Sequence, residues 1–181
     1  MEIPDLRPYI KRYDEEARDY KEFDNMANDF KNKTFLTKNE LLRIAEWKLR
    51  RLYFPKHRKE IEKNTDSLIE ETTEKAIKET DDKTKVEILD ELLHGVGIPV
   101  ASAVLTVLNP QDYAVIDING WYALYHEEKK LFTSSDFKQY INKVREIAKN
   151  QGLTAREVDK GLFILGRNMR KQKDLNSTFL V

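Results

Sequence analysis

Residues 92–117 combine the side chains and the spacing that are best suited to chemistry in this chain. Gly95 and Gly97 stand two residues apart between helical patterns, and Asp117 ends a later apolar run that begins at Tyr113. Glycine adopts backbone angles that other residues avoid, so the pair predicts a tight hairpin between two helices. The first amides of the second helix then lack intrahelical acceptors, and the helix dipole favours an anion beside them. The pattern predicts a phosphate-binding turn with one carboxylate at a fixed distance from it, which suggests work on nucleic acid.

Each of these features also has a purely structural interpretation. Glycine is common in simple helix–helix connections, so the hairpin alone does not require a ligand. Asp is among the best N-cap residues, because its side chain accepts a hydrogen bond from a backbone amide in the first helical turn. For Asp117, a capping role and a functional role do not exclude each other.

The elements that must position these residues are predicted to be helices. Gly and Pro number only 6 and 5, and apolar residues recur at helical spacing along most of the chain. The fold class is therefore all-α, with a buried central helix that begins near Pro99 and a loose polar tail after Lys171. We expect helices over residues 5–30 (one or two), from a capping box at Thr37–Glu40 to an interruption at Pro55, over 66–79, from Asp82 to the hairpin, from Pro99 to Leu108, from Asp117 through Leu124, from Ser135 to Gly152, and from a second capping box at Thr154–Glu157 onward.

A chain of 181 residues can bury a core without disulfides or metal ions. We expect one helical domain over 1–181 that forms a two-lobed bundle. One lobe covers about 35–125 and contains the hairpin, and the N-terminal segment joins about 126–175 in the other.

Charge and composition exclude several classes of protein. Lys and Arg number 32, as do Asp and Glu, so any contact with nucleic acid must come from a local patch rather than from net charge. The absence of Cys excludes disulfides, thiolate zinc sites and an iron–sulfur cluster, and the three histidines form no metal-binding pattern. No stretch reaches membrane-spanning length and the start lacks a signal-peptide pattern, so we expect a cytoplasmic protein.

The region around the two glycines resembles the helix–hairpin–helix DNA glycosylase superfamily, which includes endonuclease III and the adenine glycosylase that acts opposite oxidised guanine. That family carries L-x-G-V-G, an apolar helix rich in small residues, a short loop and an apolar run ending in V-D. Lyase-type members place a Lys two residues after the second Gly and the essential Asp eighteen residues further on. Those positions are Pro99 and Asp117 here (117 − 99 = 18), and the close match covers about residues 92–124.

The resemblance implies that the hairpin holds the backbone of duplex DNA while a target nucleotide swings into a cleft between two lobes. Asp117 would stabilise positive charge on the sugar and orient the attacking water. A sodium or potassium ion could sit on hairpin carbonyls. The implied DNA-binding residues are Leu93, His94, Gly95, Val96 and Gly97.

Two departures from the family pattern change what the resemblance implies. Pro99 replaces the lysine nucleophile and cannot form a Schiff base, so base excision would be monofunctional and use water. Many members of that family carry His at the position of Asn119. The simpler interpretation of Asn119 is that it caps a helix locally.

Aromatic and basic residues supply further candidates. Trp47, Trp121 and Tyr122 could line a base pocket, although core packing explains each of them as well. Two basic clusters could follow phosphates or could simply be solvated helix surface: Lys48, Arg50, Arg51, Lys56, His57, Arg58 and Lys59, and near the C-terminus Arg167, Arg170, Lys171 and Lys173.

Three functions remain open at this level. The first is a DNA glycosylase-like enzyme of base excision repair, the second a non-catalytic DNA-binding protein on the same scaffold, and the third a helical scaffold for another partner. The sequence names neither the base recognised nor the oligomeric state.

Overall fold

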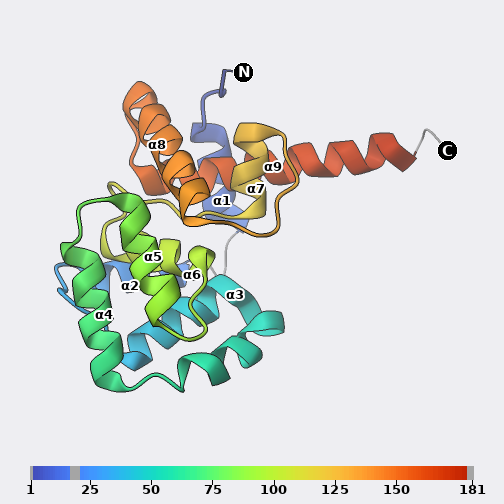
Figure 1. Ribbon diagram of the computed structural model, residues 1–181. Helices are drawn as coiled ribbons and strands as arrows, with labels where there is room; N and C mark the ends of the chain where they lie inside the picture. Colours follow the sequence, from blue (N-terminus) through green and yellow to red (C-terminus); the bar gives the residue numbers. More distant parts are fainter. Residues whose placement is uncertain (1, 17–20, 179–181) are drawn as a thin grey trace.

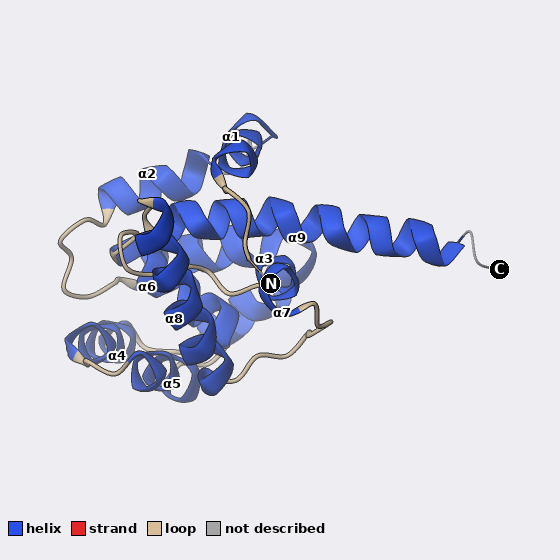
Figure 2. Cartoon of the chain, turned by 90° about the horizontal axis from the view of Figure 1, so that it is seen from above, coloured by secondary structure: helices blue, strands red, loops and turns tan. Residues whose placement is uncertain are grey.

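The computed structural model describes residues 2–16 and 21–178, apart from the side chains of residues 50–52 and 176–178. Within these ranges the chain is helical with connecting loops and turns, and no strand occurs among them (Figure 2). The predicted all-α fold class is confirmed. The described helices are α1 (Arg7–Glu16), α2 (Lys21–Asp29), α3 (Lys38–Ile61), α4 (Asp66–Lys78), α5 (Asp82–Leu92), α6 (Ile98–Leu108), α7 (Ile118–Tyr125), α8 (Ser134–Gln151) and α9 (Ala155–Thr178).

Side-chain caps determine where several helices begin. The predicted capping box at the start of α3 is confirmed, because the Thr37 side chain accepts from the Glu40 amide and Glu40 accepts from the Thr37 amide. The second predicted box is confirmed by the reciprocal pair between Thr154 and Glu157. Gly152 ends α8 in the left-handed conformation with φ 66°, as predicted for a C-terminal glycine.

Two predicted boundaries were wrong. Pro55 lies inside α3 rather than interrupting it, and the buried side chains of Phe54 and Ile61 on either side anchor both halves of the helix in the core. The residues after Lys171, which were expected to form a loose polar tail, continue α9 as a helix to Thr178. This end of α9 projects beyond the body of the protein (Figure 1). Its exposed Lys and Gln residues are good helix formers, so propensity sustains the helix without packing.

α6 is the buried central helix that the sequence predicted. Ile98 and every residue from Val100 to Val107 are buried. The helix contacts α2, α3, α5 and α8, so apolar residues cover most of its circumference. Its two buried hydroxyls stay satisfied, since Thr106 donates to the Ser102 carbonyl and Ser102 donates to the Pro99 carbonyl.

The helices form two groups in space. Figure 1 shows α1, α7, α8 and α9 in the upper part and α2 to α6 in the lower part. Within the upper group, α1, α7 and α8 each contact α9, and contacts of α8 with α5 join the two groups. Polar side chains support this junction: Arg145 of α8 pairs with Asp82, and Lys138 Nζ lies 2.6 Å from Asp81 Oδ2.

The packing of α7 on α9 depends on a missing side chain. A Cβ atom added to Gly166 would lie 1.9 Å from the Asn119 carbonyl oxygen, which is backbone and cannot rotate away. The two helices therefore approach one another at glycine, and any larger residue must push them apart.

Gly166→Ala is expected to lower the free energy of unfolding by about 3 kcal/mol, measured by urea denaturation, because α7 must move to accept the methyl group. The matched control is Gly152→Ala, where a Cβ atom meets nothing within 4 Å and only the left-handed backbone costs energy, about 1 kcal/mol. Equal losses for the two variants would contradict close packing at Gly166.

Candidate functional site

The turn between α5 and α6, residues 93–97, depends on the left-handed backbone of Gly95. Its φ is 80°, and the Val96 amide closes the turn on the Leu93 carbonyl at 3.3 Å. The prediction of an unusual backbone holds for Gly95 but was wrong for Gly97. Gly97 has φ −86° and is the N-cap of α6, a conformation that any residue adopts.

Side chains from α3 and the residues after it hold this turn in place. The buried Asn64 side chain accepts from the His94 amide and donates to the His94 carbonyl, both at 3.0 Å. His57 Nδ1 lies 3.1 Å from the Gly95 carbonyl oxygen. A Cβ atom on Gly95 would lie 2.9 Å from the His57 carbonyl oxygen, so glycine allows the turn to pack directly against α3.

The five predicted DNA-binding residues differ in whether a ligand could reach their side chains or only their backbone. Leu93 and Val96 are buried in the core, so either could reach a ligand only through its backbone, while the His94 side chain is exposed. The amides of Gly97 and Ile98 meet no protein acceptor within the described residues. These two amides are the anion-facing groups that a helix N-terminus offers.

The predicted monovalent ion would compete with protein donors. The carbonyl oxygens of Leu93, His94 and Gly95 already pair with the Val96 amide, Asn64 and His57. Each carbonyl oxygen has a second lone pair, so the ion stays a prediction. No cluster of three or more His, Asp or Glu residues suited to a metal occurs among the residues described.

Asp117 is the N-cap of α7, as predicted. Its Oδ1 atom accepts from the Gly120 amide at 2.8 Å, and the residue is half-buried. The preceding extended segment is fixed from two sides: the Ile116 amide donates to Ser102 Oγ of α6 at 3.1 Å, and the Val115 amide donates to Asp159 Oδ2 of α9 at 3.3 Å. The position of the carboxylate is thus set by hydrogen bonds on both residues before it.

Lys48 of α3 contacts the same segment. Its Nζ atom donates to the Ile116 carbonyl at 3.0 Å, and the side chain is half-buried. The sequence placed Lys48 only within a basic cluster, whereas the fold brings its amine to the residue next to Asp117.

A buried ion pair lies behind this segment. Arg156 and Asp159 are 5% and 3% exposed and share a short hydrogen bond, and Arg156 also donates to the Tyr13 hydroxyl at 2.9 Å. Burial raises the pKa of Asp159, with Asp117 adding to the rise and Arg156 opposing it. Burial alone would lower the pKa of Arg156, but Asp159 and Tyr13 raise it. The guanidinium therefore stays charged inside the core.

Tyr140 of α8 lies against the first turn of α7, because a Cβ atom added to Gly120 would lie 2.6 Å from its hydroxyl oxygen. Its hydroxyl is fully buried and has no hydrogen-bond partner within the described part of the chain. Burial, with added repulsion from Asp159 and Asp117, raises the pKa of Tyr140 far above its ordinary value. Tyr140 is therefore a neutral hydroxyl close to the N-terminus of α7.

The predicted base-pocket aromatics pack inside the protein. Trp121 is 2% exposed, with its ring centroid 4.3 Å from that of Tyr125, and Tyr122 is 7% exposed. The half-buried Trp47 ring lies 4.7 Å from Phe23. The described conformation supports the core-packing interpretation of these rings, and a role in base stacking stays a prediction that would require them to move.

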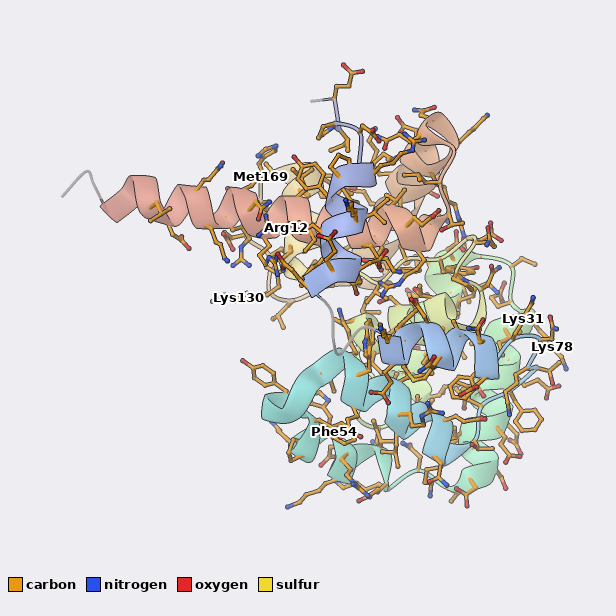
Figure 3. The ribbon with its side chains drawn as sticks, turned by 180° about the vertical axis from the view of Figure 1, so that it is seen from behind. Arg12, Lys31, Phe54, Lys78, Lys130 and Met169 are labelled. Atoms are coloured by element: carbon orange, nitrogen blue, oxygen red, sulfur yellow. The ribbon has the colours of Figure 1, made fainter. Side chains whose placement is uncertain are left out.

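Three arginines of the predicted basic clusters are paired with carboxylates. Arg58 pairs with Glu62, Arg167 pairs with Glu16, and Arg170 pairs with Glu128. The side chains of Arg50 and Arg51 lie outside the described residues. In the view of Figure 3, another cation, Lys130 of the α7–α8 loop, lies at a height between Arg12 of α1 and Phe54 of α3 and to the left of both.

Sequence reasoning missed Asn64, Tyr140, Asp159 and the specific role of Lys48. Asn64 and Lys48 contact residues 30 and 68 positions away, so no local pattern marks them. Arg156 and Asp159 stand among other charged residues, Glu157 and Lys160, at the start of α9, so no local pattern marks the burial of this pair.

The chain matches no protein-family model, and no curated protein sequence or solved structure is significantly similar to it. In the described ranges, every helix is too short or too polar to span a membrane.

Asp159→Asn is expected to lower the free energy of unfolding by about 3 kcal/mol in urea denaturation, because it leaves the buried guanidinium without its counter-charge. The double variant Asp159→Asn with Arg156→Met is expected to regain part of that loss, since it removes the uncompensated charge. A single variant as stable as the parent would show that the pair does not hold this region.

Proposed function

We propose that this protein is a helix–hairpin–helix DNA glycosylase-like enzyme that excises a damaged or modified base from duplex DNA, with Asp117 as its catalytic carboxylate. One observation carries the proposal: α3 and the residues after it contact both the 93–97 turn and the segment before Asp117. Asn64 and His57 hold the turn, and Lys48 holds Ile116. Nine residues separate Lys48 from His57, so the two contacts lie about 14 Å apart along the helix.

That spacing suits a short stretch of one DNA strand. Successive base pairs rise about 3.4 Å, so about 14 Å covers roughly four nucleotides. In the proposed complex, a phosphate at the Gly97 and Ile98 amides and the sugar at Asp117 belong to one short stretch of strand. The two helix groups differ in membership from the predicted lobes, because α7 packs on α9 and α2 packs on α3 and α6. In the proposed complex the extruded nucleotide enters between these two groups, beside Asp117.

The proposed cleavage chemistry follows from the Asp117 carboxylate and from the proline that replaces the family's lysine at position 99. Glycosidic cleavage builds positive charge on the sugar, and a fixed anion stabilises that charge in the transition state. Position 99 is proline, so base release proceeds by attack of water that Asp117 orients.

A second candidate function has its own support. Asp90 and Glu91 lie in the last turn of α5. Asp90 Oδ1 lies 4.0 Å from where a Cβ atom of residue 97 would stand. Carboxylates near a phosphate seat weaken DNA binding, and the aromatic rings expected in a base pocket are packed away. These features favour a helical scaffold that binds another partner.

Asp117→Asn is expected to abolish base release while sparing DNA binding and folding. Asn caps helices as well as Asp, so α7 keeps its N-terminus. The assay uses duplexes that each carry one damaged base, followed by alkali to cut abasic sites. The control is Asp81→Asn, another Asp that caps a helix. A fully active Asp117→Asn protein would exclude the proposed mechanism.

Gly97→Asp is expected to weaken duplex binding at least tenfold, measured by fluorescence anisotropy, because it adds a negative charge at the anion-facing amides. The backbone of residue 97 accepts any side chain, and the nearest atom to an added Cβ is Pro99 Cδ at 3.9 Å. Gly97→Asn is the neutral control of the same shape. Equal affinities for both variants would refute phosphate binding at the turn.

A further inference from the structure

Two cations of α9 share one carboxylate from the loop between α7 and α8. Arg170 Nε lies 3.3 Å from Glu128 Oε1 and Arg170 Nη2 lies 3.2 Å from Glu128 Oε2, so the guanidinium contacts both oxygens. Lys173 Nζ lies 4.0 Å from the same Oε1 atom. Arg170 and Lys173 stand three residues apart and are therefore neighbours on one face of the helix. Together they form a site for a group with two anionic oxygens.

Arg170 is held in position independently of Glu128. Its Nη1 atom donates to Asn119 Oδ1 at 3.0 Å. The Asn119 backbone lies against α9 at Gly166, one turn before Arg170. Asn119 follows Asp117 by two residues, in the helical turn that Asp117 caps. The guanidinium therefore keeps its place at the first turn of α7 when Glu128 leaves it.

The Glu128 side chain is free to leave without a movement of the loop. It is 41% exposed, and an ion pair in such contact with water contributes little to stability. Its two neighbours in the loop are fixed: Glu127 accepts from Trp121 Nε1 at 3.3 Å, and Lys129 Nζ lies 2.8 Å from Asp136 Oδ1. Rotation of one side chain into water is enough to open the site.

We propose that Arg170 and Lys173 bind a backbone phosphate of DNA, and that Glu128 occupies this site until the strand displaces it. The inference rests on the proposed function, because it takes DNA as the ligand, and it adds a phosphate contact outside the 93–97 turn. A phosphodiester has the same charge as the carboxylate and also presents two oxygens to the planar guanidinium group. Glu128 therefore competes with the phosphate and lowers the affinity of the protein for DNA.

Glu128→Gln is expected to tighten the binding of an undamaged duplex about fivefold, measured by fluorescence anisotropy, because a partly solvated ion pair no longer competes. The salt dependence should change as well. In the parent, the displaced carboxylate takes up a cation while the phosphate releases one, whereas the variant has only the release. The slope of log K against log salt concentration should therefore steepen by about 0.9.

Two further variants test whether the gain passes through the proposed site. Glu127→Gln removes the same charge at the adjacent position, and screening by salt should limit its effect on affinity. Arg170→Gln keeps a donor for Asn119 but removes the cation, so Glu128→Gln should gain nothing when added to it. An equal gain in both backgrounds, or in Glu127→Gln, would overturn the inference, because the carboxylate would then act only by general repulsion.

The outcomes separate this inference from the proposed function. Base release by the parent, with unchanged duplex affinity in Glu128→Gln, would overturn the phosphate site and leave the glycosylase proposal standing. A gain that requires Arg170, with no base released from any damaged duplex, would support the phosphate site and remove the glycosylase step. Tighter binding of inorganic phosphate by Glu128→Gln in calorimetry, with no gain for the duplex, would overturn DNA as the ligand.

Discussion

The buried charge of Arg156 is the constraint on which the arrangement around Asp117 depends. The guanidinium carbon lies 4.0 Å from the Phe23 ring centroid of α2 and 5.5 Å from that of Trp47 on α3, and the side chain also binds Tyr13 of α1. A charge removed from water must be compensated, and Asp159 provides the opposite charge. Because Asp159 also accepts from the Val115 amide, the same pair positions the segment that ends at Asp117. One buried guanidinium therefore joins helices of both groups.

α3 is the second element that fixes the geometry of the site. Lys48 lies near the middle of this helix and His57 near its end, while Asn64 lies in the turn just after its C-cap, Glu62. The turn at Gly95 and the segment at Ile116 come from separate parts of the chain, yet both hydrogen-bond to this one region. A continuous helix holds two contacts at a constant separation better than loops do. The continuity of α3 through Pro55 therefore matters for the site as well as for the fold.

Sequence patterns predicted the parts of the structure that depend on local chemistry. The capping boxes, the left-handed Gly95 and Gly152, and the buried α6 follow from residue type and periodicity over a few turns. Pro55 and the end of α9 were wrong because tertiary anchoring and sustained propensity outweighed local stop signals. The contacts of Asn64, Lys48 and Asp159 span long stretches of chain, and no helical period encodes such pairings. The sequence also could not decide the position of Trp121 and Tyr122, since an aromatic residue shortly after Asp117 is equally compatible with a ligand cleft and with the core.

The neutral net charge is compatible with the kind of contact that the turn offers. Backbone amides at a helix N-terminus bind a phosphate through hydrogen bonds and the helix dipole, without a lysine or arginine. Three arginines of the predicted clusters pair with nearby carboxylates, which reduces the long-range attraction that they add. A protein built this way would depend on geometry rather than on charge to engage DNA, and its binding should vary less with salt than that of a basic protein. Such modest electrostatic attraction suits a protein that selects a distorted or damaged site over intact duplex, because the energy of base extrusion then decides where it binds.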